Sequence, residues 1–78
     1  MKIDEISYFF FRYAEAQGRP YKALPMGTDV EEFGAPYIEI NESGVLAIVA
    51  KDRGNECLRK ETNSPEILAK WIYEMYNK

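Results

Sequence analysis

Alternating hydrophobic and polar positions mark the middle of the chain as a small sheet. Residues 37–41 alternate strictly, with Ile38 and Ile40 on one face, which is typical of a half-buried strand. Residues 45–50 are apolar on both faces and rich in β-branched side chains, which favours a central strand. Residues 56–62 are mostly polar or charged and suit an edge strand. The pattern predicts three antiparallel strands in sequence order.

Two similar turns are predicted between these strands. The first covers residues 41–44 and the second residues 51–54, and each ends in glycine, which accepts a positive φ at no steric cost. Both fit a type I turn closed by a glycine bulge. Asn41 and Asp52 favour turns because their side chains accept hydrogen bonds from nearby backbone N–H groups.

A helix is predicted over residues 2–17, because apolar residues recur there at spacings of three and four. Gly18 is the expected stop. The competing interpretation of residues 8–11 is a strand, since this aromatic run has high β-propensity. In a helix, Tyr8 and Phe11 lie away from the core, either exposed as an interface or covered by the next loop. The predicted core stripe is Ile3, Ile6, Phe10, Tyr13 and Ala14.

A second helix is predicted to begin at Pro65, with Ser64 as its N-cap. Trp71 is expected to be the central core residue of this helix, whereas Tyr73 is expected off its apolar face. The predicted apolar face consists of Ile67, Leu68, Trp71, Ile72 and Met75. Together the elements predict one α+β domain over residues 1–78, in the order α-β-β-β-α, with both helices packed on the sheet.

A long connection spans residues 18–35 and is rich in glycine and proline. Loops of this length in a small domain are usually functional or disordered. Apolar residues within it predict an ordered loop; they are Leu24, Pro25, Met26 and Phe33.

Composition narrows the possible chemistry. The chain has 46% hydrophobic residues, one cysteine and no histidine, which removes histidine-based catalysis and ordinary zinc sites. We therefore expect no catalytic residue, no metal site and no cofactor. Cys57 is expected to be a small buried hydrophobe in a reducing compartment. Asp4, Glu5 and Arg12 interrupt any signal-peptide pattern, and no stretch suits a membrane span, so a cytoplasmic protein is expected.

Charge is distributed unevenly along the chain. The net charge is −3, yet residues 23–50 contain five acidic residues and no basic one. This distribution disfavours binding to nucleic acid and would suit a basic protein partner, although a merely solubilising surface is the alternative. The five acids are Asp29, Glu31, Glu32, Glu39 and Glu42.

Several short motifs follow one another in order. They are Leu24-Pro25 with Gly27, residues 35–40, Gly44, residues 52–56, Arg59, Thr62, and the helix residues Ile67, Leu68, Trp71 and Ile72. In this order and spacing they resemble small bacterial immunity proteins of polymorphic-toxin and contact-dependent growth inhibition systems. The resemblance covers about the last two thirds of the chain.

This resemblance implies a non-enzymatic protein that binds the C-terminal toxin domain of its own system and blocks it. Many such toxins are nucleases with basic surfaces, which the acidic segment would complement. Arg53, Glu56 and Arg59 are charged residues around one turn and edge strand, and they are able to form ion pairs either with one another or with a partner. The expected toxin-binding residues are Asp29, Glu31, Glu32, Glu39, Glu42, Arg53, Glu56 and Arg59.

Two alternatives remain open at this point. One is a small adaptor or weak homodimer that uses Tyr8 and Phe11 in its contact, instead of a monomer. The other is a very small nuclease that depends on Arg, Lys and Tyr side chains, against which the acidic balance argues.

Overall fold

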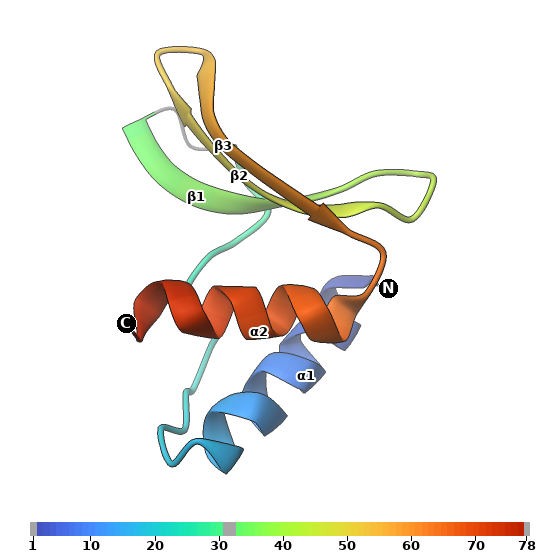
Figure 1. Ribbon diagram of the computed structural model, residues 1–78, viewed down its shortest axis with the longest axis vertical. Coiled ribbons are helices and arrows are strands. Elements are labelled where there is room, and N and C mark those ends of the chain that lie inside the picture. Colours follow the sequence, from blue (N-terminus) through green and yellow to red (C-terminus); the bar gives the residue numbers. More distant parts are fainter. Residues whose placement is uncertain (1, 31–32, 78) are drawn as a thin grey trace. The chain divides into compact units, whose positions relative to one another are not determined.

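The elements follow the order helix, three strands, helix, and the protein has an α+β fold (Figure 1). The computed structural model describes residues 2–30 and 33–77. These divide into a helical unit, within Met1–Pro25 and Ser64–Lys78, and a sheet unit, within Met26–Asn63. Neither helix of the described chain is long and apolar enough to cross a membrane.

Helix α1 spans Lys2–Ala16, which confirms helix over strand for the aromatic run. Its buried stripe is Ile6, Phe10 and Ala14, one residue per turn. The helix ends as its sequence predicts, at Gly18 with φ of 79°. The Gly18 N–H donates to the Glu15 carbonyl at 3.0 Å, and the Arg19 N–H donates to the Ala14 carbonyl at 3.0 Å. This pair of bonds is a Schellman motif, which requires the left-handed residue that glycine supplies.

Helix α2 spans Pro65–Tyr76 and begins at the predicted cap, where the Ser64 hydroxyl accepts a hydrogen bond from the Ile67 N–H at 3.3 Å. The predicted apolar face is only partly correct. Trp71 is half-buried and Ile67 is 46% exposed, so Trp71 is not the centre of the core. Tyr73, expected off the face, is buried. The buried residues of α2 are Leu68, Ala69, Ile72 and Tyr73.

The buried face of α2 is thus turned around the helix axis relative to the predicted face, and the packing of aromatic rings explains the difference. The Tyr73 ring packs edge-on against Tyr13 of α1 at a centroid distance of 5.2 Å, and Phe10 packs against Tyr21 at 4.9 Å. Asn77 closes the group, since its Nδ2 donates to the Tyr21 hydroxyl at 2.8 Å and to the Tyr73 carbonyl at 2.9 Å. Tyr73 can be buried because its ring joins this aromatic group.

The sheet contains β1 (Phe33–Ile40), β2 (Leu46–Asp52) and β3 (Asn55–Thr62), antiparallel and in that order, as predicted (Figure 1). Residues 46–50 of the central strand are all buried. Along the outer edge of β1, the Ile38 N–H donates to the Gly27 carbonyl at 2.8 Å, so the preceding loop is ordered against the sheet. Met26 beside it is buried, as expected for an apolar anchor.

The first turn matches its prediction. Gly44 has φ of 90°, and its N–H donates to the Asn41 carbonyl at 3.2 Å, as in a type I turn with a glycine bulge. The Asn41 Oδ1 accepts bonds from the Ser43 N–H and the Val45 N–H, both at 3.0 Å. Asn41 therefore caps the turn, as its side-chain chemistry predicts.

The second turn is a different type from the one predicted. Asp52 pairs with Asn55, which leaves Arg53 and Gly54 as a two-residue turn with φ of 54° and 82°. Two positive φ values define a type I′ turn, which matches the twist of the strands. The irregularity lies instead between Ala50 and Lys51, where the register with β3 shifts.

Two other expectations are wrong, and both concern irregular positions in the sheet. Cys57 is exposed, because the register passes from Leu58 to Glu56 and leaves Cys57 outside the regular pairing. Phe33 is 94% exposed and anchors nothing. The register shifts between Phe33 and Pro36, so the alternation of β1 does not extend back to Phe33.

Candidate functional site

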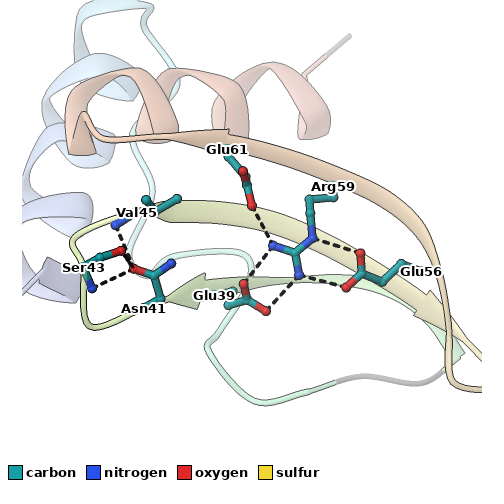
Figure 2. Close-up of polar contacts among 7 residues, drawn as sticks. All are labelled: Glu39, Asn41, Ser43, Val45, Glu56, Arg59 and Glu61. Atoms are coloured by element: carbon teal, nitrogen blue, oxygen red, sulfur yellow. Dashed lines mark hydrogen bonds and ion pairs between the residues drawn. The ribbon is translucent and has the colours of Figure 1, made fainter.

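Four charged side chains gather on one face of the sheet (Figure 2). Glu39 comes from β1, whereas Glu56, Arg59 and Glu61 come from β3. The Arg59 guanidinium lies between the three carboxylates and forms an ion pair with each, at 2.9 Å to Glu39, 2.8 Å to Glu56 and 3.0 Å to Glu61. We call these four residues the carboxylate cluster.

The strand register brings the carboxylate cluster together. Glu39 pairs with Ala47 of the central strand, which pairs in turn with Glu61, while Arg59 pairs with Val49. Neighbouring strands are about 4.8 Å apart, so the two edge strands lie roughly 10 Å apart across β2. Because Ala47 and Val49 are short, the long side chains of the edge strands can meet above the central strand.

Arg59 uses every hydrogen-bond donor that it has. A guanidinium carries five N–H groups, and Arg59 makes five hydrogen bonds within the cluster. Its Nε and Nη2 donate to the two oxygens of Glu56 at 2.9 and 2.8 Å. Its Nη1 and Nη2 donate to the two oxygens of Glu39 at 2.9 and 3.1 Å. The remaining Nη1 bond reaches Glu61 at 3.0 Å. The guanidinium therefore has no N–H left for another molecule.

The hydrogen bonds of Arg59 shift the pKa values of Glu39, Glu56 and Arg59 itself. Hydrogen bonds from Arg59 hold the pKa of Glu39 and of Glu56 below the ordinary value of 4.5. Lys51 lowers both values further through its charge. The three carboxylates also raise the already high pKa of Arg59, led by the bonds to Glu56. Glu39, Glu56 and Arg59 are consequently charged at neutral pH.

The cluster offers hydrogen-bond acceptors and negative charge to its surroundings. Each ionised carboxylate has about four acceptor positions, and the five bonds from Arg59 occupy fewer than half of those in the cluster. The side chains are accessible, with 38% of Glu39, 40% of Glu56 and 51% of Glu61 exposed. Such a surface suits a ligand that brings donors and positive charge, such as lysine or arginine side chains.

The structure unites some of the predicted binding residues and separates others. Glu39, Glu56 and Arg59 belong to one cluster, which bears out the expected pairing of Glu56 with Arg59. Glu42 and Arg53 lie in the two turns, at opposite ends of the meander, and both are exposed. Asp29 is exposed in the loop before β1. The predicted residues Glu31 and Glu32 lie outside the described part of the chain.

Glu61 is the cluster member that sequence reasoning left out of the binding set. Its position two residues after Arg59 places both side chains on the same face of β3. The register then sets it opposite Ala47, in line with Glu39. The alternation was visible in the sequence, but this cross-strand alignment depends on turn lengths and on the bulge near Lys51.

Comparison of the chain with protein-family models, curated proteins and solved structures finds no match. Within residues 2–30 and 33–77, no group of three acidic or thiol side chains is arranged to hold a metal ion. In the carboxylate cluster the central position belongs to the guanidinium of Arg59 (Figure 2).

Proposed function

We propose that this protein is an immunity protein, which binds a cognate toxin domain through the acidic face of its sheet unit and neutralises it. The observation that carries the proposal is the carboxylate cluster with its saturated arginine. Since Arg59 is fully bonded, the accessible polar atoms of the cluster are the carboxylate oxygens. A basic protein surface supplies the complementary donors, and a nuclease-type toxin has such a surface where it binds its substrate.

The charge of the whole sheet unit supports the same partner. Residues 26–63 contain eight acidic and four basic residues, whereas the rest of the chain contains five acidic and six basic residues. The sheet unit therefore carries a net charge of −4 and the remainder +1. A field of this sign speeds the encounter with a basic partner and repels nucleic acid.

The occupied guanidinium also weighs against the nuclease alternative. A catalytic arginine stabilises a phosphate through free N–H donors, usually two at once. Arg59 has all its donors directed at carboxylates, and three negative charges surround it. Phosphate would have to displace two bidentate pairs and approach three like charges.

The decisive experiment compares two charge-reversed variants in binding to the toxin domain encoded next to this protein. The first variant is Glu42→Lys with Glu61→Lys, in the sheet unit. The matched control is Glu15→Lys with Glu74→Lys, which changes two exposed residues of the helical unit by the same total charge. We expect the first variant to associate about tenfold more slowly at low salt, while the control changes little. Association rates are read from stopped-flow or surface-binding kinetics.

The salt dependence of the association rates shows whether the difference between the two variants is electrostatic. Exposed charges are screened over about 8–10 Å near physiological ionic strength, so the difference between the variants should shrink as salt is added. The variant that reverses Asp29, Glu31 and Glu32 tests the acidic residues that precede β1 in the sequence, in the same assay. Equal association rates for the two double variants, both folded by circular dichroism, would contradict the proposal. The proposal would also be contradicted if the wild-type protein failed to protect cells against that toxin.

The homodimer alternative rests on one exposed aromatic residue. Tyr8 is 55% exposed on α1, whereas Phe11 is half-buried and contributes less surface. Light scattering over a range of concentrations, on the wild type and on Tyr8→Ala, distinguishes this alternative. A dimer that dissociates in the variant would support a self-association role for α1.

A further inference from the structure

A hollow opens between the two helices of the helical unit, and its residues play no part in the carboxylate cluster. Its volume is about 470 Å³, within the range of about 300–1,000 Å³ that small-molecule sites usually have. Three of its residues come from one side of α1 and three from the beginning of α2. The lining consists of Phe9, Arg12, Tyr13, Glu66, Ile67 and Lys70.

The walls of the hollow are apolar. Phe9 and Tyr13 are half-buried, and Ile67 remains 46% exposed although it lies on a helix with a well-formed buried face. An apolar ligand body covering these side chains would remove exposed hydrocarbon from water. Burial of this kind is favourable by roughly 25 cal/mol per Å².

The rim of the hollow carries more positive than negative charge. Arg12 and Lys70 are exposed, and neither forms an ion pair with any residue in the described ranges. Glu66 is the one acid in the lining, and it lies in the first turn of α2, where a carboxylate stabilises the helix dipole. Two cations are therefore available to a ligand at this rim.

Arg12 is already held in place without its charge being neutralised. Its Nη1 donates to the Tyr8 hydroxyl at 3.1 Å, and its guanidinium lies 5.5 Å from the centre of the Tyr8 ring. The remaining N–H groups of Arg12 are accessible, in contrast to those of Arg59. An arginine fixed by a neutral aromatic partner is well suited to bind a carboxylate, because less side-chain freedom is lost on binding.

We infer that this hollow binds a small organic carboxylate with an aromatic or branched apolar body. The carboxylate pairs with Arg12 and Lys70, and the body packs against Phe9, Tyr13 and Ile67. The size of the hollow favours a small molecule, and the excess of cations at its rim selects an anion. This site is independent of the toxin-binding proposal, since it shares no residue with the carboxylate cluster.

The test uses three probes with one body and different head groups: 3-phenylpropionate, 3-phenylpropylamine and 3-phenyl-1-propanol. Each is titrated into the full-length protein and followed by amide chemical shifts in two-dimensional NMR. We expect 3-phenylpropionate to bind with saturable shifts that concentrate at the hollow. The ammonium probe has no acceptor for Arg12 and the alcohol probe carries no charge, so both should bind at least tenfold more weakly.

Substitutions in the lining give effects of opposite sign. Arg12→Met and Lys70→Met should each weaken 3-phenylpropionate binding, with Arg12→Met costing about tenfold because a charged hydrogen bond is lost. Glu66→Gln should strengthen binding by about two- to fivefold, since it removes a repelling charge. The matched control is Lys22→Met, which removes a positive charge from an exposed position outside the hollow and should leave affinity unchanged.

Several results would overturn the inference. Equal binding of the three probes would show a merely apolar patch, and an equal loss in Lys22→Met and Arg12→Met would show a response to net charge alone. Shifts spread evenly over the chain, or no saturable binding of 3-phenylpropionate to the folded protein, would also reject the site.

Discussion

Different interactions stabilise the interior of the helical unit and the interior of the sheet unit. In the helical unit, four aromatic residues from both helices and the loop pack together, mostly edge to face, and Asn77 closes the group with hydrogen bonds. In the sheet unit, the central strand is buried and aliphatic, and a cluster of four charged side chains covers part of one face. One unit concentrates apolar contacts and the other concentrates charge.

Two arginines show what this difference means for binding. Arg59 of the sheet unit is saturated by three carboxylates, so its surroundings carry net negative charge. Arg12 of the helical unit is held by the neutral ring and hydroxyl of Tyr8, so it keeps its positive charge available. The same residue type thus helps to present an anionic surface in one unit and a cationic rim in the other.

The largest effect is expected from the aromatic core of the helical unit. Phe10 is fully buried and packs against Tyr21 and Tyr73, so Phe10→Ala should lower the free energy of unfolding by about 3–5 kcal/mol. The control is Tyr8→Ala, two residues earlier and 55% exposed, which should cost below about 1 kcal/mol. Urea denaturation followed by circular dichroism measures both.

A loss this large can leave Phe10→Ala unfolded in a chain of this size. Phe10→Leu then keeps the test quantitative, because it retains an apolar side chain and should cost less than the alanine variant. The comparison between the units fails if Phe10→Ala and Tyr8→Ala are equally stable.

A smaller effect, with a distinctive pH dependence, is expected in the sheet unit. Arg59→Met should lower the free energy of unfolding at neutral pH by less than Phe10→Ala does, because three partly exposed ion pairs are lost and three carboxylates are left close together. Lys22→Met, which removes the same charge from an exposed position in the helical unit, should be nearly neutral.

The sign of the pH effect separates the variant from the wild type. The pKa values of Glu39 and Glu56 are lowered on folding, so their stabilisation is present above the ordinary value of 4.5 and is lost as pH falls through the folded values. Without Arg59, the pKa values of Glu39 and Glu56 should no longer be lowered, and protonation then relieves the repulsion between their charges. Acidification below 4.5 should therefore narrow the stability gap between the variant and the wild type. A constant gap would mean that the cluster is not coupled to folding.

The smallest effect is a gain in stability at the β2–β3 turn. Arg53 has φ of 54°, a left-handed conformation that costs most residues about 1–2 kcal/mol and that asparagine adopts more easily. Arg53→Asn creates the Asn-Gly pair preferred in type I′ turns and should raise the free energy of unfolding by about 0.5–1 kcal/mol. Arg53→Lys keeps the strain and should change nothing. Thermal unfolding of both variants measures these changes. A gain in stability in Arg53→Lys would show that the arginine head group, and not the left-handed backbone, causes the effect.

The local elements could be predicted from the sequence because their causes lie within a few residues. Ser64 and Pro65 begin α2, Gly18 ends α1, and Asn41 caps the first turn, each through contacts with its immediate neighbours. The order of the strands also follows from local patterning, since an apolar strand between two short turns becomes the middle of a meander.

What only the tertiary structure decided concerns residues far apart in the sequence. Glu39 and Arg59 meet because the register across β2 aligns them, and a one-residue shift would place their side chains on opposite faces. Helical periodicity could not choose between Trp71 and Tyr73 as the buried residue. Leu68 and Ile72 belong to the apolar face under either choice, and Trp71 and Tyr73 flank them on opposite sides of α2. Ring packing of Tyr73 against Tyr13 of α1 made that choice, and a contact between residues this far apart has no signature in the local pattern.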